Sequence, residues 1–247
     1  MLAIYKKEMR SYFINPIGYV FVGVFLAISA LLFCFTTLLS QSYDTSTYFT
    51  LMIFAFVILI PLLTMRLFSE ERKMRTEQLL LTAPVTLTGM VLGKFLAAFS
   101  MFFGCMMVSC LNFIPLYAIA ATERGATNGV TYVGPVTAEI VGSMIGIILI
   151  GAAFIAIGTF ISSVTENQLA AAIITIAVIL ALVGVGLLSS FIDIYWIRAT
   201  LSWISVIGRF SNFSTGIFDI SALVYFASLT FLFVFLTVRV YEKRRWS

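Results

Sequence analysis

Six stretches of this chain carry no charged residue and are long enough to cross the hydrocarbon core of a bilayer, which takes about 20 residues in a helix. They lie within residues 11–43, 45–65, 95–122, 140–165, 167–192 and 220–238. In lipid, every backbone N–H and C=O group has to be paired internally, and a helix meets that need within one segment. The sequence therefore predicts an all-α, polytopic membrane protein, with 1–247 forming a single transmembrane domain.

Membrane-spanning helices are expected near residues 17–40, 47–67, 91–120, 138–161, 169–190 and 221–240. The composition agrees, because 61% of the residues are hydrophobic and 11% are charged, whereas a soluble domain carries about 25% charged residues. The first apolar run is longer than the roughly 7–15 residues of a signal-peptide core, so we interpret it as a retained helix. Nucleic acid is not an expected partner, because the basic residues lie beside the spans.

The basic residues are distributed very unevenly between the two sides of the predicted bundle. One side carries twelve of them: Lys6, Lys7, Arg10, Arg66, Arg72, Lys73, Arg75, Lys94, Arg239, Lys243, Arg244 and Arg245. The other side carries three: Arg124, Arg198 and Arg209. Because cytoplasmic loops are enriched in Lys and Arg, both termini are expected in the cytoplasm, with the protein in the cytoplasmic membrane.

Segments outside the spans also carry structural signals. Residues 2–14 have apolar side chains at helical spacing and basic residues off that stripe, which is typical of an interfacial helix near anionic headgroups. A frayed start of the first span is the alternative. Asn15-Pro16 then breaks the helix. On the outer side, aromatic residues in 193–219 predict short helices at or within the outer interface.

A segment with charges of both signs, residues 66–85, separates the second and third apolar runs. We predict a helix over 69–81, because Glu70 and Glu71 fall in its first turn, where the helix dipole favours them, and Pro84 follows its end. This helix either is simply solvated beside the membrane or contacts a soluble partner. The second inner loop, 162–168, is short and polar, and by itself predicts only a turn.

Several classes of chemistry have no support in the residues. The chain has no histidine, which removes the commonest metal ligand and general base. No Asp, Glu, Lys or Arg falls in the middle of a span, as ion-coupled carriers require; Glu139 is expected at the outer end of the fourth span. Cys34, Cys105 and Cys110 lie in apolar runs and are interpreted as packing residues. No Gly-x-x-x-x-Gly-Lys-Ser/Thr motif is present, so we expect no ATP site and no catalytic residue in this chain.

The charged segment nevertheless resembles that of a known family. Ser69-Glu-Glu-Arg72, followed by Thr76-Glu77-Gln-Leu-Leu-Leu-Thr-Ala-Pro84-Val85, is similar to the cytoplasmic loop of ABC-2 type (type V) ABC transporter permeases. The start, Lys7-Glu8 and Asn15-Pro16-Ile-Gly-Tyr19, also looks like that family. The tail, from Gly208-Arg-Phe210 to Glu242-Lys-Arg-Arg-Trp246, is similar to the gliding-motility-associated branch.

The resemblance implies a half-transporter. Two permeases, identical or homologous, would pair around a pathway, and two ATP-binding cassette subunits carrying ATP and magnesium would dock beneath them. The helix at 69–81 would couple the ATPase to the spans, with 163–168 as a second docking point, helices 47–67 and 169–190 along the pathway and 193–219 as the outer gate. The ATPase-coupling residues would be Glu70, Glu71, Arg72, Arg75, Glu77 and Glu166. A separate partner with an extracytoplasmic domain occurs in some gliding-associated systems.

The function expected from this resemblance is the permease subunit of an ATP-driven exporter, with the substrate left open. The alternative is a membrane scaffold that anchors an ATPase to drive or regulate a machine outside the membrane, with nothing crossing. Small residues in the fourth and fifth spans would allow the close helix approach that an interface with two arrangements needs: Gly142, Gly146, Gly151, Gly158, Gly184 and Gly186. Ordinary span packing is the simpler interpretation of each.

Overall fold

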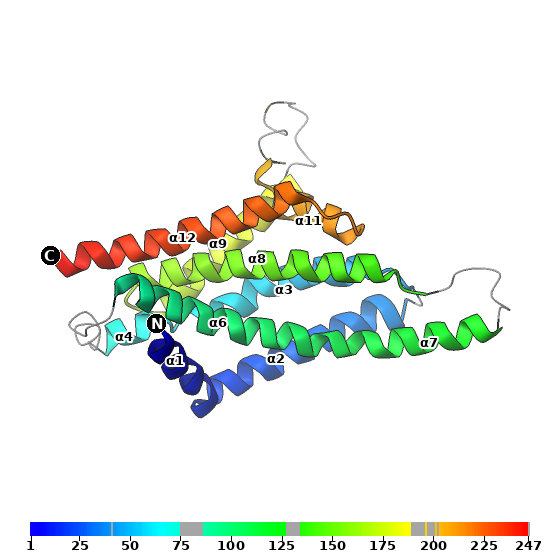
Figure 1. The fold of residues 1–247 in the computed structure, drawn as a ribbon, viewed down its shortest axis with the longest axis horizontal. Coiled ribbons are helices and arrows are strands. Elements are labelled where there is room, and N and C mark those ends of the chain that lie inside the picture. The colour runs from blue at the N-terminus through cyan, green and yellow to red at the C-terminus, as the bar shows by residue number, and fades with distance from the viewer. Residues whose placement is uncertain are drawn as a thin grey trace.

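The computed structural model describes residues 1–40, 42–74, 86–126, 134–188, 196, 201 and 203–246, and within these ranges it contains helices and no strand. Six of the helical segments are long and apolar enough to span a membrane: Pro16–Leu38, Ser46–Lys73, Leu87–Thr122, Thr137–Val164, Gln168–Leu187 and Ile220–Arg245. They run along one elongated bundle, with both chain termini at the same end (Figure 1). The predicted all-α fold with six candidate membrane-spanning helices is therefore confirmed.

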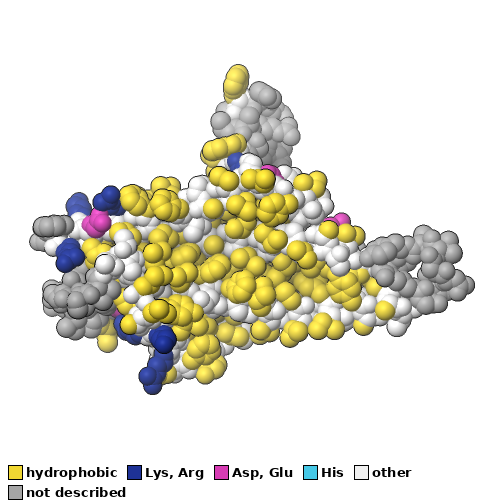
Figure 2. Space-filling model, viewed as in Figure 1, with side chains coloured by type: hydrophobic (Ala, Val, Ile, Leu, Met, Phe, Trp, Pro, Cys, Tyr) yellow, Lys and Arg dark blue, Asp and Glu magenta, His cyan; other side chains and the backbone are white. Residues whose placement is uncertain are grey.

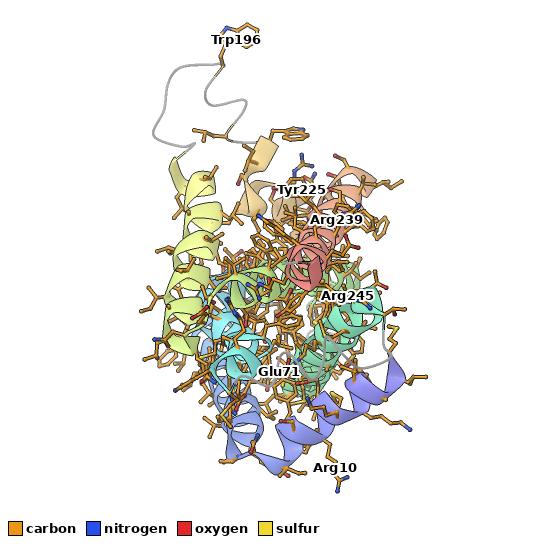
Figure 3. The ribbon with its side chains drawn as sticks, turned by 90° about the vertical axis from the view of Figure 1, so that its left-hand side faces the viewer. Arg10, Glu71, Trp196, Tyr225, Arg239 and Arg245 are labelled. Atoms are coloured by element: carbon orange, nitrogen blue, oxygen red, sulfur yellow. The ribbon has the colours of Figure 1, made fainter. Side chains whose placement is uncertain are left out.

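The first two helices meet at a sharp turn. Helix α1 (Leu2–Ile14) ends at Asn15, whose backbone is extended, and α2 (Pro16–Phe33) begins at once with Pro16 in its first position. Proline suits that position because the first N–H of a helix has no intrahelical partner. A Cβ atom at Gly18 would overlap the carbonyl oxygen of Tyr12, so only glycine allows the two helices to approach this closely. The turn places α1 across the end of the bundle (Figures 1 and 3).

Two helices form the centre of the bundle. Helix α3 (Ser46–Thr64) and helix α8 (Thr137–Val164) are buried along most of their length. Close approach depends on glycine in α8, because a Cβ atom at Gly158 would overlap the side chain of Thr64 and one at Gly151 would overlap the ring of Phe102. Small residues let helix backbones pack tightly where water is absent. These contacts lie within one chain, as ordinary span packing requires.

The third span is divided into two parts. Helix α6 (Leu87–Ser109) leads through a 3-10 turn (Cys110–Asn112) into α7 (Phe113–Ala126), and a π-helical turn (Cys34–Leu38) continues α2 at a similar depth. A buried hydroxyl cluster connects the adjoining helices here: Ser29 Oγ lies 2.9 Å from the Tyr48 hydroxyl and 2.5 Å from Ser109 Oγ, and it accepts a hydrogen bond from Asn112. Because an unpaired polar group in an apolar medium is costly, this mutual pairing is what allows the cluster to be buried.

The remaining helices cover the centre. Helix α9 (Gln168–Leu188) and helix α12 (Ile220–Trp246) pack against α8. Helix α11 (Val206–Ser214) buries Phe210 and Phe213 against the α8 surface at Gly146, where a Cβ atom added to the glycine would lie 3.1 Å from each ring. Among the described residues of the segment 193–219, helix α11 thus packs against the bundle. Arg209 of this helix rests on the rings of Tyr225 and Trp203, at 4.3 and 5.2 Å.

Candidate functional site

Charged side chains concentrate at the end of the bundle that holds both termini. Figure 2 shows dark blue Lys and Arg side chains, with acidic ones beside them, at this end, whereas the middle of the molecule presents mainly hydrophobic side chains. We call this the basic end. Helix α1, helix α4 (Ser69–Lys73), the α8–α9 turn and the last turns of α12 all meet there.

The short helix α4 begins with help from a distant part of the sequence. Oγ of Ser162, in α8, accepts hydrogen bonds from the backbone N–H groups of Phe68 and Ser69, at 3.1 and 3.2 Å, and donates one to the carbonyl oxygen of Met65. The first N–H groups of a helix have no partner within it, so an outside hydroxyl that accepts them stabilises the helix start. The position of α4 is therefore fixed on α8.

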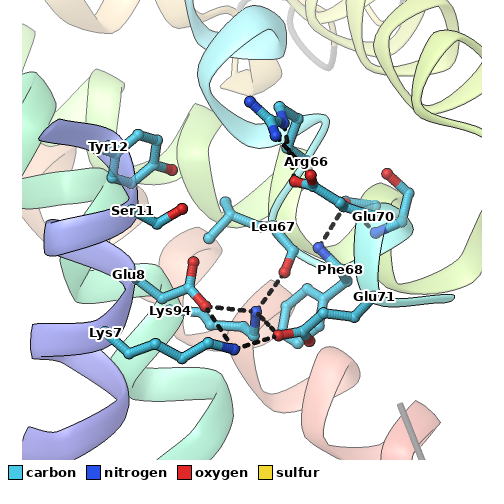
Figure 4. A network of polar contacts seen from close by, with 12 residues as sticks. Lys7, Glu8, Ser11, Tyr12, Arg66, Leu67, Phe68, Glu70, Glu71 and Lys94 are labelled. Carbon is cyan, nitrogen blue, oxygen red and sulfur yellow. Dashed lines mark hydrogen bonds and ion pairs between the residues drawn. The ribbon is translucent and has the colours of Figure 1, made fainter. Parts of the chain in front are cut away.

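An ion-pair network joins α4 to two further helices (Figure 4). Nζ of Lys94, in α6, lies 2.9 Å from Oε1 of Glu8 in α1 and 2.9 Å from Oε1 of Glu71 in α4. It also donates to the carbonyl oxygen of Leu67 at 2.6 Å and lies 5.1 Å from the centre of the Phe68 ring. Only 1% of the Lys94 side chain is exposed. A buried ammonium group needs this many partners, because desolvation of a lone charge is very costly.

Two further residues of α1 lie at this end: Lys7 extends the network toward the surface, and Tyr12 bonds inward to the end of α3. Nζ of Lys7 lies 3.1 Å from Oε1 of Glu71 and 3.9 Å from Glu8. Burial opposes the charge of Lys7, but the nearby carboxylates, Glu71 first, outweigh it and hold the pKa of Lys7 above its ordinary value. Burial together with the Glu8 charge raises the pKa of Tyr12, so its hydroxyl stays protonated and donates to the carbonyl oxygen of Leu63 at 3.3 Å.

A second bridge connects α4 with the α8–α9 turn. Nη2 of Arg72 lies 2.7 Å from Oε1 of Glu166, and its Nη1 donates to the carbonyl oxygen of Val164 at 2.7 Å. The same turn is contacted from the C-terminal side, since Arg244 donates to the carbonyl oxygen of Ser163 at 2.8 Å. These contacts make α4 and the α8–α9 turn one continuous surface at the basic end.

The structure brings together four of the six predicted coupling residues. Glu71 pairs with Lys94, Arg72 pairs with Glu166, and Glu70 pairs with Arg66 of the preceding turn, with Nε of Arg66 2.9 Å from Oε2. Arg75 and Glu77 lie outside the described residues, as does the predicted continuation of this helix toward residue 81. Helix α4 is described over Ser69–Lys73.

Three residues at the centre of the site do not stand out in the sequence. In the sequence, Lys94 is one of several basic residues beside a span, and Glu8 is part of the predicted N-terminal helix. One signal is available for Lys94: it stands inside an otherwise apolar helix, where an ionisable residue calls for a partner. Ser162 gives no signal, because its hydrogen-bond partners lie more than 90 positions away in the chain.

A small cavity of about 30 Å³ lies between α1 and the α3–α4 turn, which is enough for one or two water molecules. Its lining combines acidic, basic and hydroxyl groups: Glu8, Ser11, Tyr12, Asn15, Ile17, Gly18, Arg66, Leu67 and Glu70. Within the described part of the chain, no three His, Cys, Asp or Glu side chains gather as metal ligands would. The site holds hydrogen-bond donors and fixed charges of both signs.

Comparison with known proteins identifies one matching family. The family described as ABC-2 family transporter protein matches residues 10–184. This range includes the first four spans, most of the fifth, α4 and the α8–α9 turn, and it ends before α11 and α12. The match supports the family and gives no support to the gliding-motility-associated branch. No curated protein matches the chain.

Proposed function

The chain belongs to the ABC-2 family of transporter proteins, and we propose that it is the permease subunit of an ATP-driven exporter in a bacterial cytoplasmic membrane. A separate ATP-binding cassette subunit would supply ATP and magnesium and would dock at the basic end. Both termini would then face the cytoplasm, in keeping with the concentration of Lys and Arg at that end.

The observation that carries this proposal is the bridge between Arg72 and Glu166. The two segments expected to contact an ATPase, α4 and the α8–α9 turn, are far apart in sequence but are joined by a 2.7 Å ion pair and by the Ser162 hydroxyl. A soluble partner that binds α4 would therefore act on α8 as well. Helix α8 is central to the bundle, so movement at this surface would reach the core.

The Lys94 network gives the same surface a second route into the spans. Glu71 of α4 shares the Lys94 ammonium group with Glu8 of α1, and Lys94 belongs to the third span. Coupling requires an element with two arrangements that a partner can bias. We infer that ATP binding shifts α4 as a unit with these partners and so changes the packing of α1, α6 and α8.

The pathway would form between two copies of the permease or between this chain and a homologue. Helix α3, expected along the pathway, is largely packed inside the bundle, but Ile58 and Leu51 remain exposed on it, at 66% and 36%. The neighbouring α9 exposes Leu169, Ile173 and Leu180. This exposed strip of α3 and α9 is the surface on which we place the second permease. The substrate class stays open.

Reconstitution of the complex into proteoliposomes tests the transport function. The copurified complex is compared with a complex whose ATPase subunit carries a substitution of the Walker A lysine. For each candidate cargo, the measurement is its ATP-dependent loss from one leaflet or compartment. ATP-dependent movement of any cargo supports the exporter. ATPase activity that no cargo stimulates, with no movement, favours the membrane scaffold instead.

A further inference from the structure

Helix α1 presents three basic side chains at the edge of the bundle. In Figure 3, which looks at the basic end, α1 runs across the view, and Arg10 points away from the bundle. Lys6 and Lys7 lie on the same helix and are exposed. A helix that lies across the ends of the spans follows the plane of the membrane surface, so a side chain pointing outward from it reaches neighbouring lipid headgroups.

Two of these cations, Lys6 and Arg10, form no ion pair with any described residue, although Glu8, Glu70 and Glu71 lie at the same end of the molecule. An open, shallow hollow of the surface, here called the groove, lies along one face of α1, and its lining belongs entirely to that helix and its C-cap: Ala3, Lys6, Lys7, Arg10, Ser11, Ile14 and Asn15. The groove therefore combines three cations, two neutral polar side chains and an apolar edge.

We propose that this groove binds the headgroup of an anionic phospholipid from the surrounding leaflet. The phosphate would accept hydrogen bonds from Lys6 and Arg10, as charge-assisted pairs of this kind are strong. The apolar side chains beside the groove fit the glycerol and upper acyl region, because Ile14 and Phe13 are 68% and 52% exposed. A free phosphate ion would use the cations but not this apolar edge.

The site has a direct connection to α4 through Lys7. Its side chain lines the groove, and its Nζ lies 3.1 Å from Oε1 of Glu71. A bound phosphate would share Lys7 with Glu71, which would keep Lys94 as its other partner at 2.9 Å. The lipid would thereby weaken the Lys7–Glu71 ion pair, which is one of the contacts that hold α4 in place. Binding by the chain itself is independent of the transported substrate and of the proposed exporter function.

Native mass spectrometry of the purified full chain tests the site. Three ligands are titrated separately: dioleoylphosphatidylglycerol, dioleoylphosphatidylcholine and inorganic phosphate. Each is titrated onto the wild type, onto the α1 double variant Lys6→Gln/Arg10→Gln and onto the α12 double variant Lys243→Gln/Arg245→Gln. The last variant removes two basic residues from α12 at the same end. Each basic residue near an anionic surface contributes about a fivefold factor in binding. We expect phosphatidylglycerol binding to weaken by about thirtyfold in the α1 variant, following the same factor per residue, and to stay nearly unchanged in the α12 variant.

The Lys7 link has its own variant. Glu71→Gln removes the competitor for Lys7 and is expected to tighten phosphatidylglycerol binding up to about fivefold, whereas Glu242→Gln on α12 serves as its matched control and leaves binding unchanged. Equal losses in the two basic double variants would overturn the site, because they would show general electrostatic attraction only. Equal binding of inorganic phosphate would overturn the lipid as ligand. No change in Glu71→Gln, or the same change in Glu242→Gln, would overturn the link to α4.

Discussion

Nζ of Lys94 lies 2.9 Å from Oε1 of Glu71, and this ion pair is buried, since only 1% of the lysine side chain is exposed. This pair crosses from the third span to α4, and Glu8 completes it from α1. Breaking a buried ion pair by removing one partner is strongly destabilising, because the remaining charge loses its compensation. The pair therefore has consequences that can be measured in the isolated chain.

Lys94→Met is expected to lower the free energy of unfolding by about 3–5 kcal/mol, because it removes the buried cation that Glu8 and Glu71 share and leaves only the exposed Lys7 beside the two carboxylates. Thermal unfolding of the purified chain in mild detergent measures the effect. Lys73→Met removes an exposed lysine from α4 and should change stability by less than about 0.5 kcal/mol. Adding Glu71→Gln to Lys94→Met should recover part of the loss. Similar melting temperatures for the two lysine variants would contradict the role of Lys94.

Ser162→Ala should loosen the start of α4. The substitution removes the acceptor for the N–H groups of Phe68 and Ser69, which costs about 1–2 kcal/mol locally. Hydrogen exchange at these two amides should accelerate by about tenfold, as a local loss of that size implies. Ser163→Ala is the matched control, because Oγ of Ser163 donates within its own helix, to Phe160. Unchanged exchange in Ser162→Ala would mean that α4 holds its position without this contact.

The Arg72–Glu166 pair should matter for coupling more than for stability. Arg72 is 17% and Glu166 77% exposed, and pairs at the surface contribute about 0–1 kcal/mol. Arg72→Glu or Glu166→Arg alone should reduce permease-stimulated ATPase activity several-fold, and the double exchange should restore most of it. The same exchange at Arg239 and Glu242, a pair on α12, should have little effect. If the double exchange is no better than the single ones, the pairing is not what couples the two segments.

Gly158→Ala should destabilise the bundle by about 1–3 kcal/mol, because its Cβ would overlap the Thr64 side chain of α3. Gly184→Ala is the comparison, since a Cβ there meets no other atom within 4 Å. The expected result is a lower melting temperature for Gly158→Ala and an equal or higher one for Gly184→Ala. Equal melting temperatures would show that α3 and α8 can separate slightly without cost.

The sequence predicts the spans and the charged residues of α4. It does not predict which residues pair at the site, because the pairing depends on how the helices pack. Charge-free runs determine where helices can cross lipid, so the six spans can be predicted from the sequence alone. The charges of α4 and Glu166 are also visible, but their pairing depends on how α3, α8 and α9 pack. Lys94 and Glu8 are counted among the charges of the chain, but their pairing cannot be predicted from sequence spacing, because they lie 86 positions apart and meet only through the packing of α1 on α6.

The most direct test of the central claim is recovery of the chain from native membranes in mild detergent, with identification of the bound proteins and an ATPase assay of the complex. A subunit with a Walker A motif should copurify and the complex should hydrolyse ATP, and Glu71→Lys should abolish the recovery of that subunit while Lys73→Met does not. Recovery of the folded chain without any ATPase, under conditions that preserve other membrane complexes from the same preparation, would contradict the assignment as an exporter permease.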